Sequence, residues 1–413
     1  MILKSIILLI SYIQILGFGY FFNNLFSLNF RDLSKIFLLG FIFQSIILQI
    51  HYIFFPINFK FTFIQTIISI SFFLFFSKIS FEQFIRYFRD KKLISTFFIL
   101  IFILSQSTSL EYPTNFSIPD FYLYHKNFVD WANNYPVIEG LALLNPRHGY
   151  AGTTYLNAAY YNFYPFFNNG WSILTPLFIL FFQILFFQII IKVSKYPKNS
   201  LKIYNIYLLL SSYLILKIIM IISKADISHF LIFTIISIYL FYLLLRLTNN
   251  FNIGDAKIIL ITAIFLPTTL FSISIYSFLL IIVVLFYLVK NDKFFEIDKT
   301  SIVIIFVFSI VPMLYLNYIK TGYFFYPANF IENLFNFQKP WSVKPETGMN
   351  FIKGAGDYNW AKEKNLKIAL ITNWPPFFLS LILTPFFIFI LSFYKDFRKY
   401  FLLFFLCIFL III

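Results

Sequence analysis

Runs of about 20 apolar residues recur along almost the whole chain, and this repetition constrains the fold more than any other feature. Each helical residue adds about 1.5 Å, so about 20 apolar residues cross a bilayer core about 30 Å thick. Only 12% of the 413 residues are charged, which is about half the share usual in soluble domains. The repetition therefore predicts an all-α polytopic membrane protein and excludes an ordinary soluble domain.

About twelve such segments form a single predicted membrane domain over residues 1–413. They centre on roughly 2 to 23, 36 to 56, 61 to 79, 93 to 107, 171 to 191, 203 to 222, 227 to 245, 256 to 271, 272 to 289, 300 to 318, 370 to 394 and 400 to 413. Pro267 interrupts the stretch between Lys257 and Lys290, which could be two short helices or one broken helix. The first run is too long for a cleavable signal and is expected to remain as a membrane helix.

The net charge of +15 follows the predicted topology. If the loop around 80 to 93 is cytoplasmic, alternation places most other basic residues on the same side: Arg31, Lys35, Lys192, Lys195, Lys198, Lys202, Arg246, Lys257, Lys290, Lys293, Lys299, Lys395, Arg398 and Lys399. The short connections opposite hold only Lys60 and Lys224. Cytoplasmic loops are enriched in Lys and Arg, so the pattern predicts an outside N-terminus and requires no nucleic-acid partner.

Two long polar stretches, 108–170 and 319–369, then fall on the outer face. They are rich in Tyr, Trp, Asn, Pro and Gly, and long loops of this kind are where function is expected. Cys407 is the single cysteine, which excludes intrachain disulfides and Cys-based metal sites. The sequence contains no His/Glu cluster with metal spacing, no P-loop and no Rossmann fingerprint, so we expect no metal and no cofactor.

The first long loop contains a predicted interfacial helix from Asp120 to Ala132, with an apolar stripe at Phe121, Phe128 and Ala132. Asp120 begins this helix and is either an N-cap or a general base at the membrane surface. His125 falls on the apolar stripe and is either a packed histidine or a substrate-binding group.

Further along, Asp130 is expected to form a solvated i, i+4 pair with Lys126. Arg147 and His148 follow in a turn-like stretch, where the guanidinium could contact a phosphate or act as an interfacial anchor.

Two residues at span ends complete the candidates. Asp226 opens a span and either caps its helix or helps to form a donor site. Lys320 lies just outside the predicted span 300 to 318, where it is either a point charge for phosphate or a snorkelling interfacial lysine.

The order of several short motifs resembles a poorly characterised bacterial family of polytopic inner-membrane proteins, over about residues 117 to 362. The motifs are Asp120…Tyr124-His125…Trp131…Tyr135-Pro136-Val137…Gly140-Leu141…Arg147…Gly149, Ser223…Asp226, Pro312…Asn317…Gly322-Tyr323…Tyr326-Pro327, Trp341-Ser342-Val343 and Trp360-Ala361-Lys362. The architecture is similar to the GT-C superfamily of membrane glycosyltransferases. Pro-x-x-x-x-Asn followed by Gly-Tyr resembles their protein O-mannosyltransferase and aminoarabinose transferase branch. The chain departs from those relatives at several positions. They have Arg before the Asn, where this chain has Leu316, and Lys320 lies one helical turn later. Pro146 and Ala151 stand where Gly and Asn would be expected.

The resemblance implies a GT-C-like glycosyltransferase of the bacterial inner membrane. It would move a sugar from a polyprenyl-phosphate donor to a lipid, glycan or protein acceptor on the outer face. Asp120 would be its catalytic residue, and the substrate-binding residues would be Tyr124, His125, Asp130, Arg147, His148, Asp226 and Lys320. The alternatives are a flippase or transporter, or a polymerase or ligase, for lipid-linked surface polysaccharide, and a non-catalytic membrane scaffold. Transport sites need charges near the bilayer midplane, and these spans are nearly charge-free.

Overall fold

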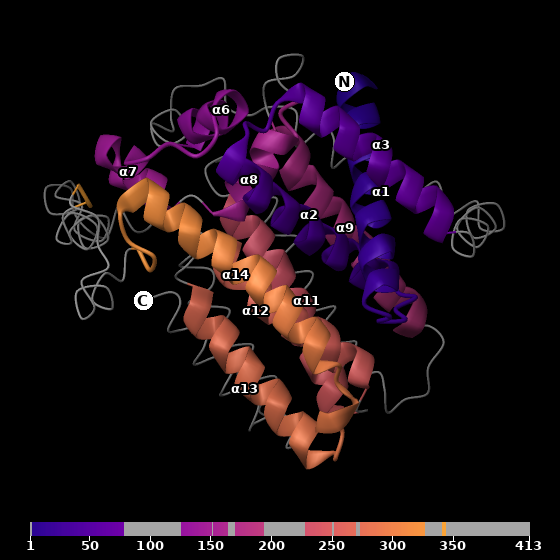
Figure 1. Ribbon diagram of the computed structural model, residues 1–413. Helices are drawn as coiled ribbons and strands as arrows, with labels where there is room; N and C mark the ends of the chain where they lie inside the picture. The colour runs from indigo at the N-terminus through magenta and orange to yellow at the C-terminus, as the bar shows by residue number, and fades with distance from the viewer. Residues whose placement is uncertain are drawn as a thin grey trace, which may run out of the picture.

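The computed structural model describes residues 2–77, 125–150, 152–163, 170–193, 228–249, 252–269, 273–326 and 341–343. Within these ranges the regular structure is entirely helical, as predicted. The long helices form a bundle, and short helices cover one of its ends (Figure 1). We call this covered part the roofed end.

The long helices are α1 (Ile2–Leu25), α2 (Leu33–Phe54), α3 (Phe59–Phe76), α9 (Trp171–Val193), α11 (Ser228–Asn249), α12 (Ile253–Thr269), α13 (Ser274–Lys290) and α14 (Lys299–Thr321). The short ones are α6 (Lys126–Asn134), α7 (Leu141–Leu144), η2 (Pro146–Tyr150), α8 (Thr153–Tyr160) and η4 (Phe294–Glu296). Every predicted span that falls on described residues is a helix. The predicted spans 93 to 107, 203 to 222, 370 to 394 and 400 to 413 lie outside the described residues.

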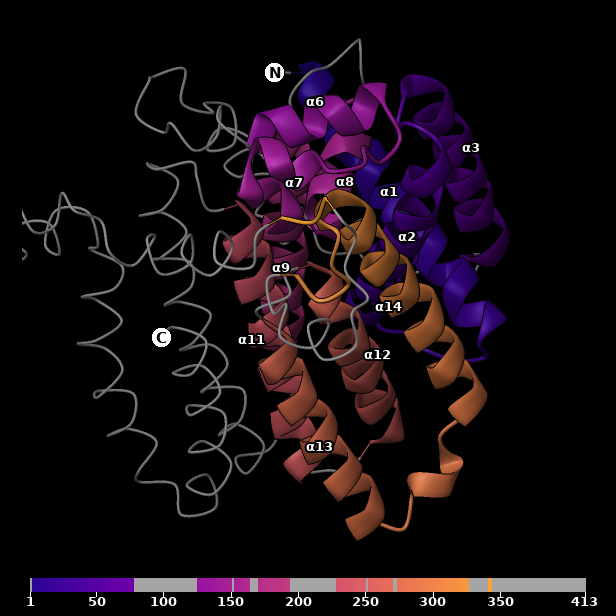
Figure 2. The same cartoon turned by 60° about the vertical axis from the view of Figure 1, so that its left-hand side comes forward.

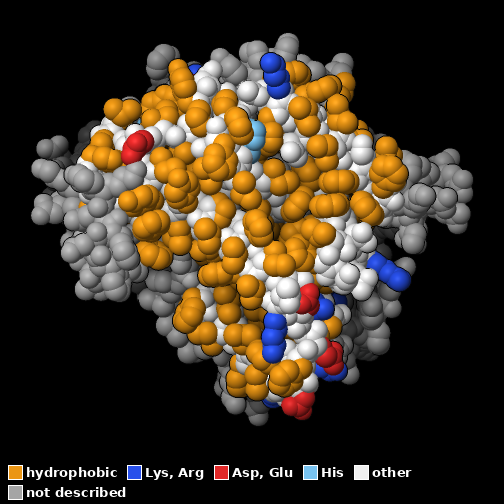
Figure 3. All heavy atoms as spheres, viewed as in Figure 1, with side chains coloured by type: hydrophobic (Ala, Val, Ile, Leu, Met, Phe, Trp, Pro, Cys, Tyr) orange, Lys and Arg blue, Asp and Glu red, His pale blue; other side chains and the backbone are white. Residues whose placement is uncertain are grey.

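Four described helical segments are long and apolar enough to cross a membrane: Ile6–Leu25, Leu33–Phe54, Phe59–Phe76 and Lys299–Thr321. Several large apolar side chains on them face outward, including Phe63 on α3 and Phe308 on α14. Figure 3 shows a broad hydrophobic surface with charged side chains mostly toward its edges. A surface of this kind suits lipid rather than water, and the protein is a membrane protein. The total of about twelve spans stays a prediction.

The stretch between Lys257 and Lys290 consists of two separate helices, α12 and α13, which pack against each other. Pro267 lies in the last turn of α12, where the hydrogen bond that its missing N–H removes is near the end of the helix. The alternative of one broken helix is therefore wrong.

Close backbone contact holds the first two helices together. At Gly40 of α2, an added Cβ would lie only 1.8 Å from the Ile15 carbonyl oxygen of α1, so only glycine fits there. The Asp32 carboxylate caps α2 by accepting from Ser34 N at 3.0 Å.

All eight residues of α8 are buried, and polar side chains fix this short helix inside the bundle. Gln44 Nε2 of α2 donates to Asn157 Oδ1 at 2.8 Å, and Asn157 Nδ2 donates to Ser45 Oγ at 2.8 Å. The Tyr161 hydroxyl donates to Gln44 Oε1 at 3.1 Å. Because these groups satisfy one another, α8 provides a fixed support for the roofed end.

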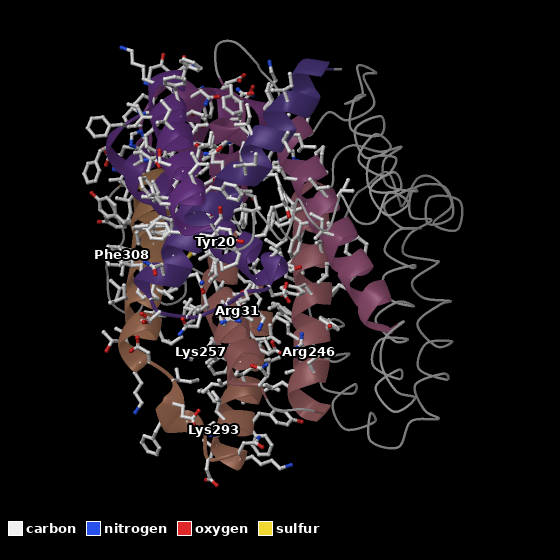
Figure 4. The ribbon with its side chains drawn as sticks, turned by 90° about the vertical axis from the view of Figure 1, so that its right-hand side faces the viewer. Tyr20, Arg31, Arg246, Lys257, Lys293 and Phe308 are labelled. Atoms are coloured by element: carbon white, nitrogen blue, oxygen red, sulfur yellow. The ribbon has the colours of Figure 1, made fainter. Side chains whose placement is uncertain are left out.

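A buried ion pair lies at the opposite end of the bundle. Lys35 Nζ of α2 is 2.5 Å from Asp255 Oδ1 of α12, and the Asp255 side chain is fully buried. Arg246 Nε of α11 lies 3.2 Å from Asp255 Oδ2 without hydrogen-bond geometry. Figure 4 shows Arg31, Arg246, Lys257 and Lys293 toward this same end. These basic residues therefore share one side of the bundle, as the charge pattern predicts, and we call it the charged end.

Candidate functional site

The roofed end is built by the two predicted long loops over the ends of α2 and α14. In the first loop, Val137 N donates to Tyr52 O of α2 at 2.9 Å. Gly140 N donates to Ile319 O of α14 at 3.0 Å. Figure 2 shows α6 and α7 gathered at this end, beside the upper end of α14.

The second loop joins the first at the same place. Val343 N donates to Thr321 O at 3.0 Å, and the Tyr326 hydroxyl donates to Pro146 O at 3.3 Å. Gly322 ends α14 in the left-handed region, with φ of 83°, and this turns the chain back over the helix end. Described residues of the stretches 108–170 and 319–369 are thus in contact at this end of the bundle.

Lys320 is not a snorkelling lysine outside a span, and that expectation is wrong. Helix α14 continues to Thr321, so Lys320 lies in its last turn, where the residue is 2% exposed. Its Nζ donates to Gly149 O at 3.4 Å and lies 5.7 Å from the centre of the Phe128 ring. The segments of the roofed end, which the span prediction did not include, cover the end of α14 and enclose the Lys320 side chain.

His148 is the second buried basic side chain at the roofed end. It is 2% exposed, and its ring packs 4.8 Å from Trp131 and 6.5 Å from Phe128. Burial, reinforced by the nearby charges of Lys320 and His125, lowers the pKa of His148 to about 4. The imidazole is therefore neutral at pH 7 and can both donate and accept a hydrogen bond.

His125 immediately precedes α6. It is a packed histidine, which is the first of the two interpretations given from the sequence. The residue is 4% exposed, and its Nδ1 is hydrogen-bonded to the Tyr155 hydroxyl of α8 at 2.6 Å. The two rings stack with their centres 5.3 Å apart, and Trp171 of α9 meets the histidine ring edge-on. This contact ties the start of α6 to the interior of the bundle.

The remaining described candidates lie farther out. Asp130 pairs with Lys126 at 3.6 Å, and both side chains are more than one-third exposed, which confirms the solvated pair. Arg147 is half-buried in η2, and its backbone N–H donates to Asn145 Oδ1 at 3.0 Å. The turn-like stretch is thus a 3₁₀ helix, and a phosphate contact of Arg147 stays a prediction.

Asp120, Tyr124 and Asp226 lie outside the described residues. Among the residues that are described, no group of three or more His, Cys, Asp or Glu side chains has the arrangement of a metal site.

Comparison with known proteins gives one assignment. The whole chain, residues 1–413, matches the family described as Domain of unknown function (DUF8201). The chain belongs to this family. No curated protein and no solved structure matches it. Family membership therefore carries no activity with it, and a function has to be argued from the site.

Sequence reasoning missed two residues on α2 that reach the roofed end. Gln49 and Tyr52 are each 1% exposed, and the Tyr52 ring lies 6.1 Å from Phe128. The available signal was Gln49 itself, since a buried polar side chain in a span costs free energy unless it is paired or functional. The roofed end thus combines a buried lysine, a neutral imidazole, an amide, a phenol and several aromatic rings.

Proposed function

We propose that this protein is a membrane glycosyltransferase that moves a sugar from a polyprenyl-phosphate donor to a lipid, glycan or protein acceptor of the bacterial cell envelope. The observation that carries the proposal is the buried Lys320 side chain near His148, at the end of a bundle of apolar helices. A lipid phosphate keeps its tail in the bilayer and its charge at the surface. A cation enclosed at a helix end, among aromatic rings, matches that geometry.

The full arrangement that we propose has about twelve spans in the inner membrane, with loops 108–170 and 319–369 on the outer face. Asp120 takes the proton of the acceptor hydroxyl, and the acceptor oxygen forms a bond to the anomeric carbon. The lipid phosphate leaves with the electrons of the broken glycosidic bond, so the configuration is inverted. Tyr124, Arg147 and Asp226 complete the substrate contacts, and Lys320 stabilises the phosphate.

A flippase or transporter, and a polymerase or ligase, remain the alternative functions. Transport would be favoured by charged groups near the middle of the spans. The buried Lys35–Asp255 pair instead joins residues in the first turns of α2 and α12, which supports the transferase over transport. A polymerase or ligase would use the same kind of donor and differs in its acceptor.

Lys320→Met tests the phosphate site because it removes the charge and keeps most of the side-chain volume. We expect the purified variant to bind farnesyl phosphate roughly 10- to 100-fold more weakly, since a hydrogen bond to a charged group contributes about 1.5–3 kcal/mol. Lys126→Met is the matched control, because Lys126 lies at the same end but is exposed. Equal binding by the two variants would contradict the role of Lys320.

Asp120→Asn tests the catalytic base. Asn retains most of a helix cap but cannot take a proton from the acceptor, so transfer should be lost while donor binding and thermal stability remain. Transfer is measured with purified protein and by the surface-glycan profile of a strain carrying the variant. Wild-type transfer in both measurements would leave Asp120 with a capping role only.

A further inference from the structure

Of the buried polar atoms that have no hydrogen-bond partner among the described residues, four belong to α2 and η2 at the roofed end. They are Nε2 and Oε1 of Gln49, the hydroxyl of Tyr52 and Nδ1 of His148. Each of these three residues is at least 98% buried. Buried polar groups are nearly always paired, so three unpaired side chains in one region require a physical reason.

Two of the three side chains, Tyr52 and His148, pack against the Phe128 ring. Gln49 and Tyr52 are three residues apart on α2 and therefore share a helix face. The Phe128 ring lies 6.1 Å from the Tyr52 ring and 6.5 Å from the His148 ring. Lys320 Nζ is 5.7 Å from the same ring, so Tyr52, His148 and Lys320 all border Phe128.

The chemistry of these groups differs from that of Lys320. An ammonium only donates, which suits a phosphate that only accepts. An amide, a phenol and a neutral imidazole together both donate and accept, which suits hydroxyl groups that do the same. The rings of Phe128 and Trp131 supply apolar surface beside them, as in other sites for ring-shaped ligands.

We infer that Gln49, Tyr52 and His148 bind the hydroxyl groups of the donor's sugar while Lys320 holds the phosphate. This inference rests on the proposed transferase function, which it deepens by assigning residues of α2 and η2 to sugar recognition. A sugar subsite also gives a reason for the unpaired atoms. They would form hydrogen bonds with the ligand, and without ligand they lower the free energy of unfolding.

The test compares donor analogues with and without a sugar. Farnesyl phosphate and farnesyl phosphates carrying glucose, mannose, galactose or N-acetylglucosamine are titrated onto the purified full-length protein. We expect at least one sugar-bearing analogue to bind about tenfold more tightly than farnesyl phosphate. Tyr52→Phe and Gln49→Leu should lose that preference and bind farnesyl phosphate as the wild type does.

Tyr161→Phe is the matched control. The Tyr161 hydroxyl is equally buried but is paired with Gln44, so this variant should lower the Tm and keep the sugar preference. Tyr52→Phe and Gln49→Leu should keep or raise the Tm without ligand, since they remove only unpaired atoms.

Each other outcome is informative. If the wild type prefers no sugar, or if both α2 variants keep the preference, the sugar subsite is wrong and the phosphate site stands. A Tm lowered in the α2 variants as far as in Tyr161→Phe would show a structural role instead. If the wild type binds none of the analogues, the proposed function fails and the inference fails with it.

Discussion

The ionisation of His148 makes the roofed end sensitive to acid. The ordinary pKa of 6.5 applies to the unfolded chain, and burial lowers it to about 4 in the folded protein. Between these two values, the unfolded chain binds a proton that the folded protein does not. The free energy of unfolding therefore decreases as the pH falls through this window, and His148 adds no further change below it.

We predict that His148→Gln weakens this acid dependence, because the amide has no charge to acquire. The Tm of the purified protein is measured from pH 7.5 to pH 4.5 in one detergent. The wild type should lose more of its Tm than the variant between about pH 6.5 and pH 4.5. Burial is the main cause of the shift, and the charges of Lys320 and His125, which add to it, are unchanged in the variant. Parallel curves for both proteins would contradict the prediction.

At the scale of single residues, the sequence predicted local features and missed distant ones. The Lys126–Asp130 pair and the turn at Arg147 depend on neighbours within a few residues, so their spacing was sufficient. The burial of Lys320 depends on Gly149, which is 171 residues away, and no local pattern contains that contact. Asp255 was missed for the same reason, since its partner Lys35 is 220 residues distant.

At the scale of helices, Asp255 connects three elements through one carboxylate. It belongs to α12, Lys35 to α2 and Arg246 to α11, so the charged end depends on a single fully buried group. A buried ion pair contributes little compared with a well-packed apolar pair, but removing one partner leaves an uncompensated charge and costs about 3–5 kcal/mol.

We predict that Asp255→Asn strongly lowers the Tm and that adding Lys35→Met restores part of it. The second change removes the ammonium that the first leaves without its partner, so the two effects should not add. A double-mutant cycle in Tm, with Lys35→Met alone as the fourth corner, measures this coupling. Strictly additive changes would show that the pair does not hold α2 and α12 together.

Helices were the best predicted feature of the fold, and the physical reason is length. A run of about 20 apolar residues has few stable structures other than a helix in lipid. The ends were less certain, because they depend on caps and partners. Helix α14 runs past its predicted end, since Gly322 turns the chain only after Thr321 and Val343 pairs with that residue. The role of α8 was missed, because its polar side chains pair with α2 across the bundle.

At the scale of the molecule, the two ends of the bundle should face opposite sides of the membrane. We predict that a cysteine at Asn134, or at position 353 in place of Lys353, is labelled from outside intact cells, in a Cys407→Ser background. Asn134 is exposed at the roofed end, whereas Lys353 lies outside the described residues. Lys293→Cys at the charged end is the matched control and should react only after permeabilisation. The opposite pattern would reverse the topology and exclude an outer-face donor.

The unequal lengths of the helices have a mechanical consequence for the membrane. Helix α13 has 17 residues, or about 26 Å, and presents outward-facing Phe278, Phe286 and Val289 along it. Helix α14 has 23 residues, or about 35 Å, and also presents apolar side chains outward. A hydrocarbon layer about 30 Å thick matches neither, and each ångström of mismatch costs a fraction of a kcal/mol. If both helices face lipid, we expect lipid chains beside α13 to be compressed and those beside α14 to be stretched or the helix to tilt, so that the bilayer differs in thickness between the two flanks.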